Sequence, residues 1–137
     1  MAQFLEFVAN HWLLWSAFTA VAFALVVNIT LAGRGQIDAQ SLVRLINQDN
    51  AVTVDVRGEA DYKRGHIVDA LHVPLASLPD RIKELEPHRG GPLVVYCELG
   101  NLSPRAAIKL KQAGFDNVLR LRGGLSAWRQ ASLPTVT

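Results

Sequence analysis

The chain has 137 residues, half of them hydrophobic, and 14 basic against 12 acidic side chains give it a formal net charge of +2. This length allows one domain of ordinary size with a short appendage. The weak positive charge comes without a Lys/Arg run or interleaved aromatic residues, so we expect no binding to nucleic acid. The single cysteine excludes an intrachain disulfide and two-cysteine zinc or redox motifs, and it fits a reducing compartment.

The N-terminal segment is predicted to cross a membrane. Residues 7–33 contain no charged side chain, and the middle of this run is apolar around the whole circumference of a helix. The run passes the roughly 20 residues that a helix needs to span a bilayer. Trp12 and Trp15 lie near one end, where interfacial aromatic residues are common. We therefore expect residues 11–32 to bind the membrane, within an N-terminal anchor of residues 1–33.

Two other interpretations of this segment are open. A buried core helix would need cover on every face, which a domain of this size cannot supply. A cleaved signal peptide would begin with a positive region, whereas residues 1–11 contain Glu6 and neither Lys nor Arg. For an uncleaved anchor, Arg34 and Arg44 beyond the span place the C-terminal domain in the cytoplasm by the positive-inside rule.

The rest of the chain, residues 34–137, is predicted to form one α/β domain, because its apolar patterns alternate between helix and strand periods. Helices are expected from the cap Asp38 to Ile46, over 59–63, from Pro79 to Leu85, over 103–111 up to the terminating Gly114, and around Leu125 and Trp128. Strands are expected over 51–56, 71–73, 93–96 and 118–121, with a loop over 87–92. This alternation favours a largely parallel sheet flanked by helices.

The stretch around Cys97 has the features of a nucleophilic site. Cys97 directly follows the strand 93–96, and after a short loop Ser103 can cap and Pro104 can begin a helix. This arrangement points backbone N–H groups and the positive end of a helix toward the sulfur, which favours a thiolate. The same N–H groups form a cradle for an anion. Cys97 is therefore a candidate nucleophile, although a lone cysteine after a strand is also common as a small buried apolar residue.

Several motifs follow one another along the domain. They are Asp55-Val56-Arg57, Glu59, Gly65-His66-Ile67, Ala70, Pro74, the Cys97 loop, Gly123-Gly124 and Trp128. Together they resemble the single-domain rhodanese family over residues 38–134, and with the preceding anchor the chain is similar to membrane-anchored bacterial rhodanese-like proteins. The resemblance implies a rhodanese-like α/β domain, with a small parallel sheet flanked by helices, preceded by one transmembrane helix. It also implies a single-pass protein of the bacterial inner membrane whose C-terminal domain faces the cytoplasm.

The resemblance further implies a sulfurtransferase activity. Cys97 would take a sulfane sulfur from a small donor such as thiosulfate or a persulfide, hold it as a persulfide, and pass it to a thiol or protein acceptor, without a metal or organic cofactor. The substrate-binding residues would be Arg57, Arg105 and the loop residues Glu98, Leu99, Gly100, Asn101, Leu102 and Ser103. No histidine spacing indicates a metal site.

Two loop positions depart from the pattern of active members. Glu98 and Leu102 stand where these often carry basic residues. We expect Glu98 to place a negative charge beside the nucleophile and to slow the entry of an anionic donor such as thiosulfate, and Leu102 to remove a sulfonate ligand. The alternative to a sulfurtransferase is a catalytically weak rhodanese-like module that docks a partner at the membrane. For Asp55 and His66 we expect structural roles.

Overall fold

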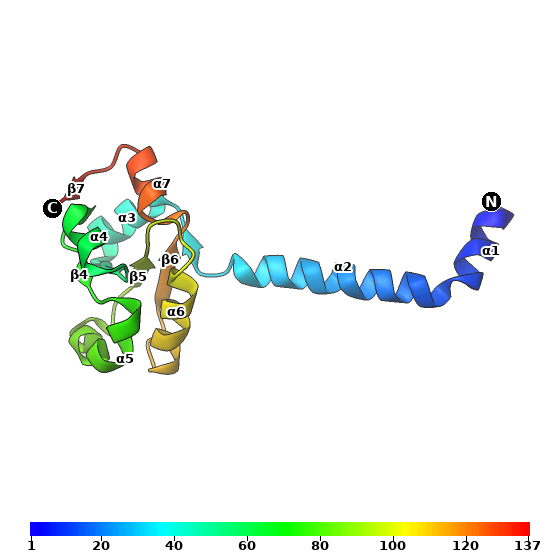
Figure 1. Ribbon diagram of the computed structural model, residues 1–137, viewed down its shortest axis with the longest axis horizontal. Helices are drawn as coiled ribbons and strands as arrows, with labels where there is room; N and C mark the ends of the chain where they lie inside the picture. Colours follow the sequence, from blue (N-terminus) through cyan, green and yellow to red (C-terminus); the bar gives the residue numbers. More distant parts are fainter. The chain divides into compact units, whose positions relative to one another are not determined.

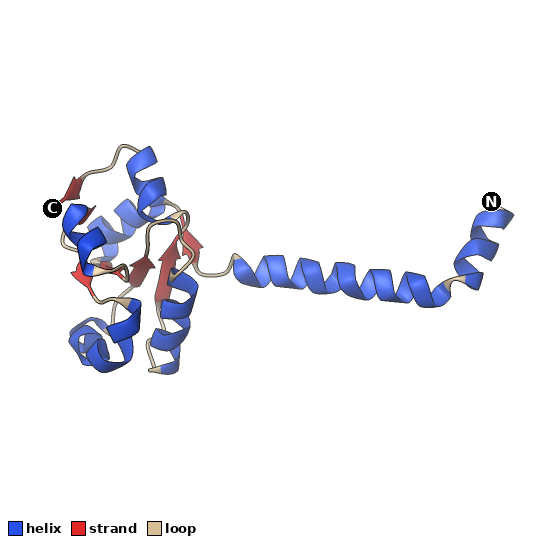
Figure 2. Cartoon of the chain, in the orientation of Figure 1, coloured by secondary structure: helices blue, strands red, loops and turns tan.

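The computed structural model describes residues 1–31 and 33–137 in full, and Ala32 only as the last residue of a helix (Figures 1 and 2). The chain divides into two compact units, Met1–Arg34 and Gly35–Thr137. The first unit is helical, and the second combines helices with strands.

The N-terminal unit consists of helix α1 (Ala2–Asn10) and helix α2 (Trp12–Ala32). Within α2 the segment Trp12–Leu31 is long and apolar enough to cross a membrane, and none of it is buried inside the protein. Its hydroxyl groups are satisfied within the helix, because Ser16, Thr19 and Thr30 donate to carbonyls three or four residues earlier. Such internal bonds lower the cost of placing a hydroxyl in hydrocarbon. By length and composition, α2 can therefore span a bilayer.

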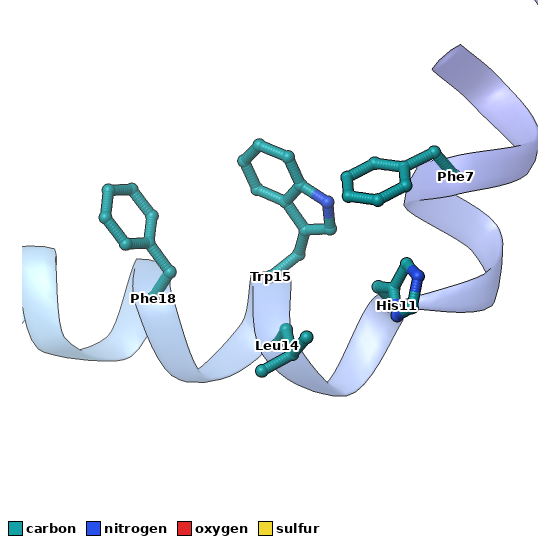
Figure 3. Close-up of a pocket in the computed structure, with 5 residues that line it drawn as sticks. All are labelled: Phe7, His11, Leu14, Trp15 and Phe18. Carbon is teal, nitrogen blue, oxygen red and sulfur yellow. The ribbon is translucent and has the colours of Figure 1, made fainter. Parts of the chain in front are cut away.

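The bend between α1 and α2 carries a cluster of aromatic side chains (Figure 3). The rings of Phe7 and His11 lie 4.7 Å apart, and Trp15 meets Phe18 edge-on with ring centroids 6.3 Å apart. Together with Leu14, these side chains line an apolar hollow of about 440 Å³. Aromatic side chains at the end of an apolar helix are typical of the boundary between lipid and water.

The second unit is organised around a five-stranded parallel sheet in the order β1-β6-β5-β2-β4. Its strands are β1 (Gln36–Ile37), β2 (Val52–Asp55), β4 (Leu71–His72), β5 (Leu93–Tyr96) and β6 (Val118–Leu121). A separate antiparallel pair joins β3 (His66–Ile67) to β7 (Thr135–Val136). All four side chains of the central strand β5 are buried, as is typical of a parallel strand covered on both faces. The carboxyl end of β5 therefore lies in the middle of one sheet edge.

Helices cover both faces of this sheet (Figures 1 and 2). They are α3 (Ala39–Asp49), α4 (Glu59–Arg64), α5 (Leu78–Arg81), α6 (Ser103–Gln112), α7 (Gly124–Gln130) and the 3₁₀ helices η1 (Leu75–Ser77) and η2 (Ile82–His88). On one face, α5, η2 and α6 pack Leu78, Leu85 and Leu110 against the sheet. On the other face, α3 and α7 contribute Leu42 and Trp128. Each face thus has its own apolar core, and β5 contributes alternate side chains to both.

The predicted α/β fold with a parallel sheet flanked by helices is confirmed. Asp38 caps α3 as expected, since its carboxylate accepts a hydrogen bond of 2.8 Å from the N–H of Ser41. Ser103, however, does not cap α6. It is already the first helical residue, Leu102 holds the cap position, and the hydroxyl of Ser103 donates to the carbonyl of Gly100 over 3.3 Å. The loop is so short that the helical backbone begins one residue earlier than the cap pattern implied.

Two further differences concern short segments. The loop predicted over 87–92 begins later, because η2 continues through Pro87 to His88. The fixed φ of proline is compatible with a 3₁₀ turn, so Pro87 does not end the helix. Strands β1, β3 and β7 were not predicted, since a strand of two residues is too short to show a periodic pattern.

Candidate active site

Cys97 directly follows the central strand β5 and lies under a tight loop with no exposed surface. The N–H groups of Gly100 and Leu102 donate to its sulfur over 3.1 and 3.3 Å, and the sulfhydryl donates to Oδ1 of Asn101 over 3.6 Å. Two converging backbone donors stabilise negative charge on the sulfur. These donors can therefore stabilise the negative charge that a cysteine sulfur carries when it acts as a nucleophile.

The loop keeps this shape because a glycine allows helix α7 to approach it closely. Gly124 has a φ of +60°, and a Cβ at this position would clash with the carbonyl oxygen of Cys97. The close approach lets the N–H groups of Leu125 and Ser126 donate to the carbonyls of Cys97 and Glu98, over 2.8 and 3.0 Å. The carbonyls of Cys97 and Glu98 thus face α7, while the N–H groups of Gly100 and Leu102 face the sulfur.

Arg57 follows β2, the strand beside β5, and its side chain is only 4% exposed. Its Nε and Nη2 donate to the carboxylate of Asp55, with Nη2 and Oδ2 2.7 Å apart, and Nη2 also donates to the carbonyl of Gly65 over 2.7 Å. Burial by itself would lower the pKa of Arg57, but the hydrogen bonds and charge of Asp55, together with the hydrogen bond to Glu98, raise this pKa above its ordinary value. Arg57 is therefore a permanent buried cation, and Asp55 is its structural partner.

Glu98 connects the Cys97 loop to two arginines. Its Oε2 lies 2.7 Å from Nη1 of Arg57, and its Oε1 lies 3.1 Å from Nη1 of Arg129 in α7. The carboxylates of Asp55 and Glu98 thus hold the guanidinium of Arg57 between the ends of β2 and β5. Glu98 is not the isolated negative charge that the sequence indicated, because two guanidinium groups compensate it.

A polar pocket of about 290 Å³ lies beside Glu98. Its lining consists of Arg57, Asp61, Arg64, Glu98 and Arg129. Asp61 and Arg64 form an ion pair within α4. The lining carries three positive and two negative side chains, and Arg57 is also paired with the buried Asp55, so the charges around the pocket balance while Glu98 is in place.

The remaining predicted site residues lie in different surroundings. Leu99 and Asn101 are exposed on the loop, whereas Leu102 is half-buried against the core that contains α6. Arg105 is exposed in the first turn of α6, and among residues 1–31 and 33–137 its side chain has no hydrogen bond or ion pair. The structure therefore brings Arg57 to the Cys97 loop, whereas Arg105 bonds to that loop only through its backbone N–H, which donates to the carbonyl of Leu102 over 3.1 Å.

Two histidines enclose the ring of Tyr62. The ring centroids of His66 and His72 lie 3.8 and 4.4 Å from that of Tyr62. Nδ1 of His66 bonds to the carbonyl of Tyr62, and Nε2 of His72 bonds to the carbonyl of Arg57, each over 2.9 Å. These bonds satisfy the backbone around α4, so His66 is a structural residue here. Within the described part of the chain, no group of three His, Cys, Asp or Glu side chains could hold a metal ion.

Arg129 is the residue near Cys97 that reasoning from the sequence missed. It lies 31 residues after its partner Glu98, on a helix with no charged motif. Only the packing of α7 against the loop brings the two side chains together. The one signal in the sequence is its spacing of one helical turn from Leu125, on the helix that follows the paired glycines.

Known proteins are similar to most of the chain. The rhodanese-like domain family matches residues 38–131. A protein of Allochromatium vinosum named sulfurtransferase is 39% identical over 102 residues, which covers 74% of this chain and 94% of that protein. The uncharacterized protein YibN of Escherichia coli is 32% identical over 144 residues, covering 99% of this chain and 98% of that protein. An uncharacterized protein of Synechocystis is 38% identical over 110 residues, and there the chain spans 56% of the relative's length.

Solved structures share the fold. A rhodanese-related protein from Thermoplasma volcanium matches with a TM-score of 0.67 and 30% identity, covering 74% of this chain and 96% of that chain. A protein from Lactobacillus plantarum reaches a TM-score of 0.73 at 28% identity, covering 83% of this chain and 98% of that chain. At these TM-scores, both proteins share the fold of this chain over most of its length.

Proposed function

The chain belongs to the rhodanese-like family, and from this premise we propose that it is a sulfurtransferase that carries sulfur as a persulfide on Cys97. Relatives named as sulfurtransferases support a sulfurtransferase-type function. The observation that carries the persulfide step is the pair of N–H groups, from Gly100 and Leu102, that converge on the sulfur. In the thiolate the negative charge lies on this sulfur, and in a persulfide anion it lies on the adjacent outer sulfur, so N–H groups of the same loop can stabilise the charge in both states.

The transfer proceeds in two half-reactions that need no external oxidant or reductant. In the first, the Cys97 thiolate attacks the outer sulfur of the donor and forms a new S–S bond. The S–S bond of the donor breaks, and sulfite (from thiosulfate) or a thiolate (from a persulfide) leaves with the electron pair. In the second, an acceptor thiolate attacks the terminal sulfur of the persulfide, and Cys97 leaves as a thiolate.

Entry of the donor requires the loop to open, because Cys97 has no exposed surface. The two ends of the loop differ in how firmly they are held. Leu99 is 66% exposed, whereas Leu102 packs against the core. We expect the segment from Leu99 to Asn101 to move during sulfur transfer while Leu102 stays in place, since exposed side chains with few contacts open at low cost.

We also propose that residues 1–33 anchor the protein in the bacterial inner membrane, with a single pass through residues 11–32, and that residues 34–137 form a cytoplasmic domain. The apolar helix α2 and the aromatic side chains at its N-terminal end support this arrangement. Arg34 and Arg44 follow the span, as the positive-inside rule requires. A cleaved signal sequence would contain the same apolar helix, so detection of residues 1–33 in the mature protein by mass spectrometry separates the two possibilities.

Intact-mass spectrometry of the full-length protein tests the persulfide. The protein is purified in detergent, incubated with thiosulfate or with glutathione persulfide, and compared with the Cys97→Ser variant. We expect the unmodified protein to gain one sulfur atom and the variant to gain none. The absence of any gain, with either donor, would instead favour a rhodanese-like module that docks a partner at the membrane.

A further inference from the structure

The carboxylate of Glu98 contacts two arginines at once, as the carboxylate of a bound ligand would. One oxygen lies 2.7 Å from Nη1 of Arg57, and the other lies 3.1 Å from Nη1 of Arg129. The first distance is that of a charge-assisted hydrogen bond, and the second lies within the ordinary range of N–H···O hydrogen bonds. The two guanidinium groups come from different parts of the domain, the end of β2 and helix α7, and they meet at this carboxylate.

The three side chains differ in how firmly they are held. Arg57 is buried and bound to Asp55 and to the carbonyl of Gly65, so it keeps its place when Glu98 moves away. The side chains of Glu98 and Arg129 are 47% and 44% exposed, so both can change rotamer without disturbing the core. Rotation of Glu98 toward solvent would leave Nη1 of Arg57 without its carboxylate partner.

The polar pocket beside this pair has the size and charge for a small anion. It holds about 290 Å³, and of its two acidic side chains Asp61 is already paired with Arg64. When the carboxylate of Glu98 leaves, the pocket therefore has an excess of positive charge. Because Glu98 follows Cys97 in the chain, an anion bound here lies next to the loop that covers the sulfur.

We propose that Arg57 and Arg129 form a carboxylate-binding subsite beside Cys97, that Glu98 fills this subsite at rest, and that a carboxylate on a small sulfur donor or acceptor displaces it. Glu98 itself demonstrates that a carboxylate fits the two guanidinium groups. The exchange of one carboxylate for another keeps both arginines paired, so it loses little electrostatic energy. The role of the ligand in sulfur transfer rests on the proposed function, whereas the binding of the anion does not.

Displacement of Glu98 also releases one attachment of the loop. The side chain of Glu98 ties the loop to Arg57 and Arg129, and its carbonyl is separately held by the N–H of Ser126. A ligand that displaces the side chain of Glu98 breaks its bonds to Arg57 and Arg129, whereas the hydrogen bond from Ser126 to the carbonyl of Glu98 remains. The loop then opens over Cys97 when a suitable carboxylate is present, which couples recognition of the ligand to access to the sulfur.

Nuclear magnetic resonance of the full-length protein in detergent micelles tests this subsite with acetate as the probe. Glu98→Gln keeps the size of the side chain and removes its charge, so we expect it to bind acetate on the order of tenfold more tightly than the unmodified protein. The Nε–Hε resonances of Arg57 and Arg129 should shift on binding, and adding Arg129→Gln should abolish the gain. Glu86→Gln removes a carboxylate from the exposed pair with Arg89 and is the matched control, with no expected change in acetate binding.

Equal acetate affinity of Glu98→Gln and the unmodified protein, or a gain that survives Arg129→Gln, would overturn the inference. Tighter binding of sulfate than of acetate would overturn the assignment to carboxylates. In the unmodified protein, the carboxylate carbon resonance of Glu98 should move toward that of free glutamate as acetate is added, and a constant resonance contradicts displacement. A gain in acetate affinity without any persulfide on Cys97 would reject the proposed function and leave the subsite standing.

Discussion

Glu98 and Arg57 lie 41 residues apart in the sequence, and a hydrogen bond of 2.7 Å joins Oε2 of the first to Nη1 of the second. This bond connects the carboxyl ends of two neighbouring parallel strands, β2 and β5. It fixes the side chain that follows Cys97 and compensates its charge. The electrostatic surroundings of the candidate nucleophile are therefore set by a buried cation on the adjacent strand as much as by the loop itself.

Arg57→Met is expected to destabilise the domain strongly. The change leaves the carboxylate of Asp55 fully buried without a cation and removes the donor to the carbonyl of Gly65. An uncompensated buried charge of this kind costs about 3–5 kcal/mol of the free energy of unfolding. Urea denaturation of the full-length protein in detergent measures the loss.

The matched control for this prediction is Arg81→Met, which removes an arginine from an exposed pair with Glu84. Exposed ion pairs contribute little to stability, so this variant should unfold at nearly the same urea concentration as the unmodified protein. Equal midpoints for Arg57→Met and Arg81→Met would show that the Asp55–Arg57 pair is not a stabilising element.

Gly124→Ala is expected to disturb the Cys97 loop, although Gly124 lies far from this loop in the sequence. Gly124 has a φ of +60°, and a methyl group there would clash with the carbonyl oxygen of Cys97. We expect a loss of about 1–3 kcal/mol in the free energy of unfolding and slower gain of sulfur by Cys97 in a mass-spectrometric time course. Gly90→Ala serves as the control, because a methyl group at Gly90 meets nothing within 4 Å; identical behaviour of the two variants would contradict the close approach of α7.

The cap of helix α3 predicts a pH-dependent contribution to stability. The hydrogen bonds from Ser41 hold the pKa of Asp38 below its ordinary value, so the folded state favours the carboxylate. This stabilisation is complete above the ordinary pKa and is lost as the pH falls through the lowered value. The melting temperature of the unmodified protein should therefore fall more steeply with acidification than that of Asp38→Asn, and parallel curves would refute the prediction.

Protease treatment of membrane vesicles tests the proposed orientation. Inverted inner-membrane vesicles should lose the domain of residues 34–137 to added protease, and right-side-out vesicles should protect it. Removal of residues 1–33 should release the domain from vesicles washed with alkaline carbonate. Digestion of the domain in right-side-out vesicles, or release of the complete chain by carbonate, would exclude the anchored, cytoplasm-facing arrangement.

The sequence predicted most of the domain because its patterns are local. The strand over 118–121 is found at those residues, and the apolar run 93–96 forms the central strand because both faces of the sheet are covered. The cap Asp38 and the terminating glycine of α6 depend on neighbouring residues alone and were predicted correctly. Helix ends that depend only on neighbouring residues can be predicted from the sequence.

The surroundings of Cys97 were harder to predict because they depend on packing between distant segments. Apart from the spacing of Arg129 from Leu125, nothing in the sequence indicated that Arg129 would reach Glu98, or that Gly124 would lie against the carbonyl of Cys97. The tight loop also shifted Ser103 from the cap position into the helix. The sequence thus indicated Cys97 as a candidate nucleophile and the N–H groups of its loop as donors, whereas the charge balance around Cys97 emerged only from the fold.

The antiparallel pairing of β7 with β3 brings the C-terminus of the chain next to Gly65, whose carbonyl binds the guanidinium of Arg57. An affinity tag or fluorescent protein fused after Thr137 would therefore begin close to the polar pocket and could obstruct it. The exposed turn at Gly90 is a better point of attachment, since a side chain there touches nothing. The fusion site therefore decides whether a measured rate of sulfur transfer reflects the protein itself or obstruction of the pocket by the fused label.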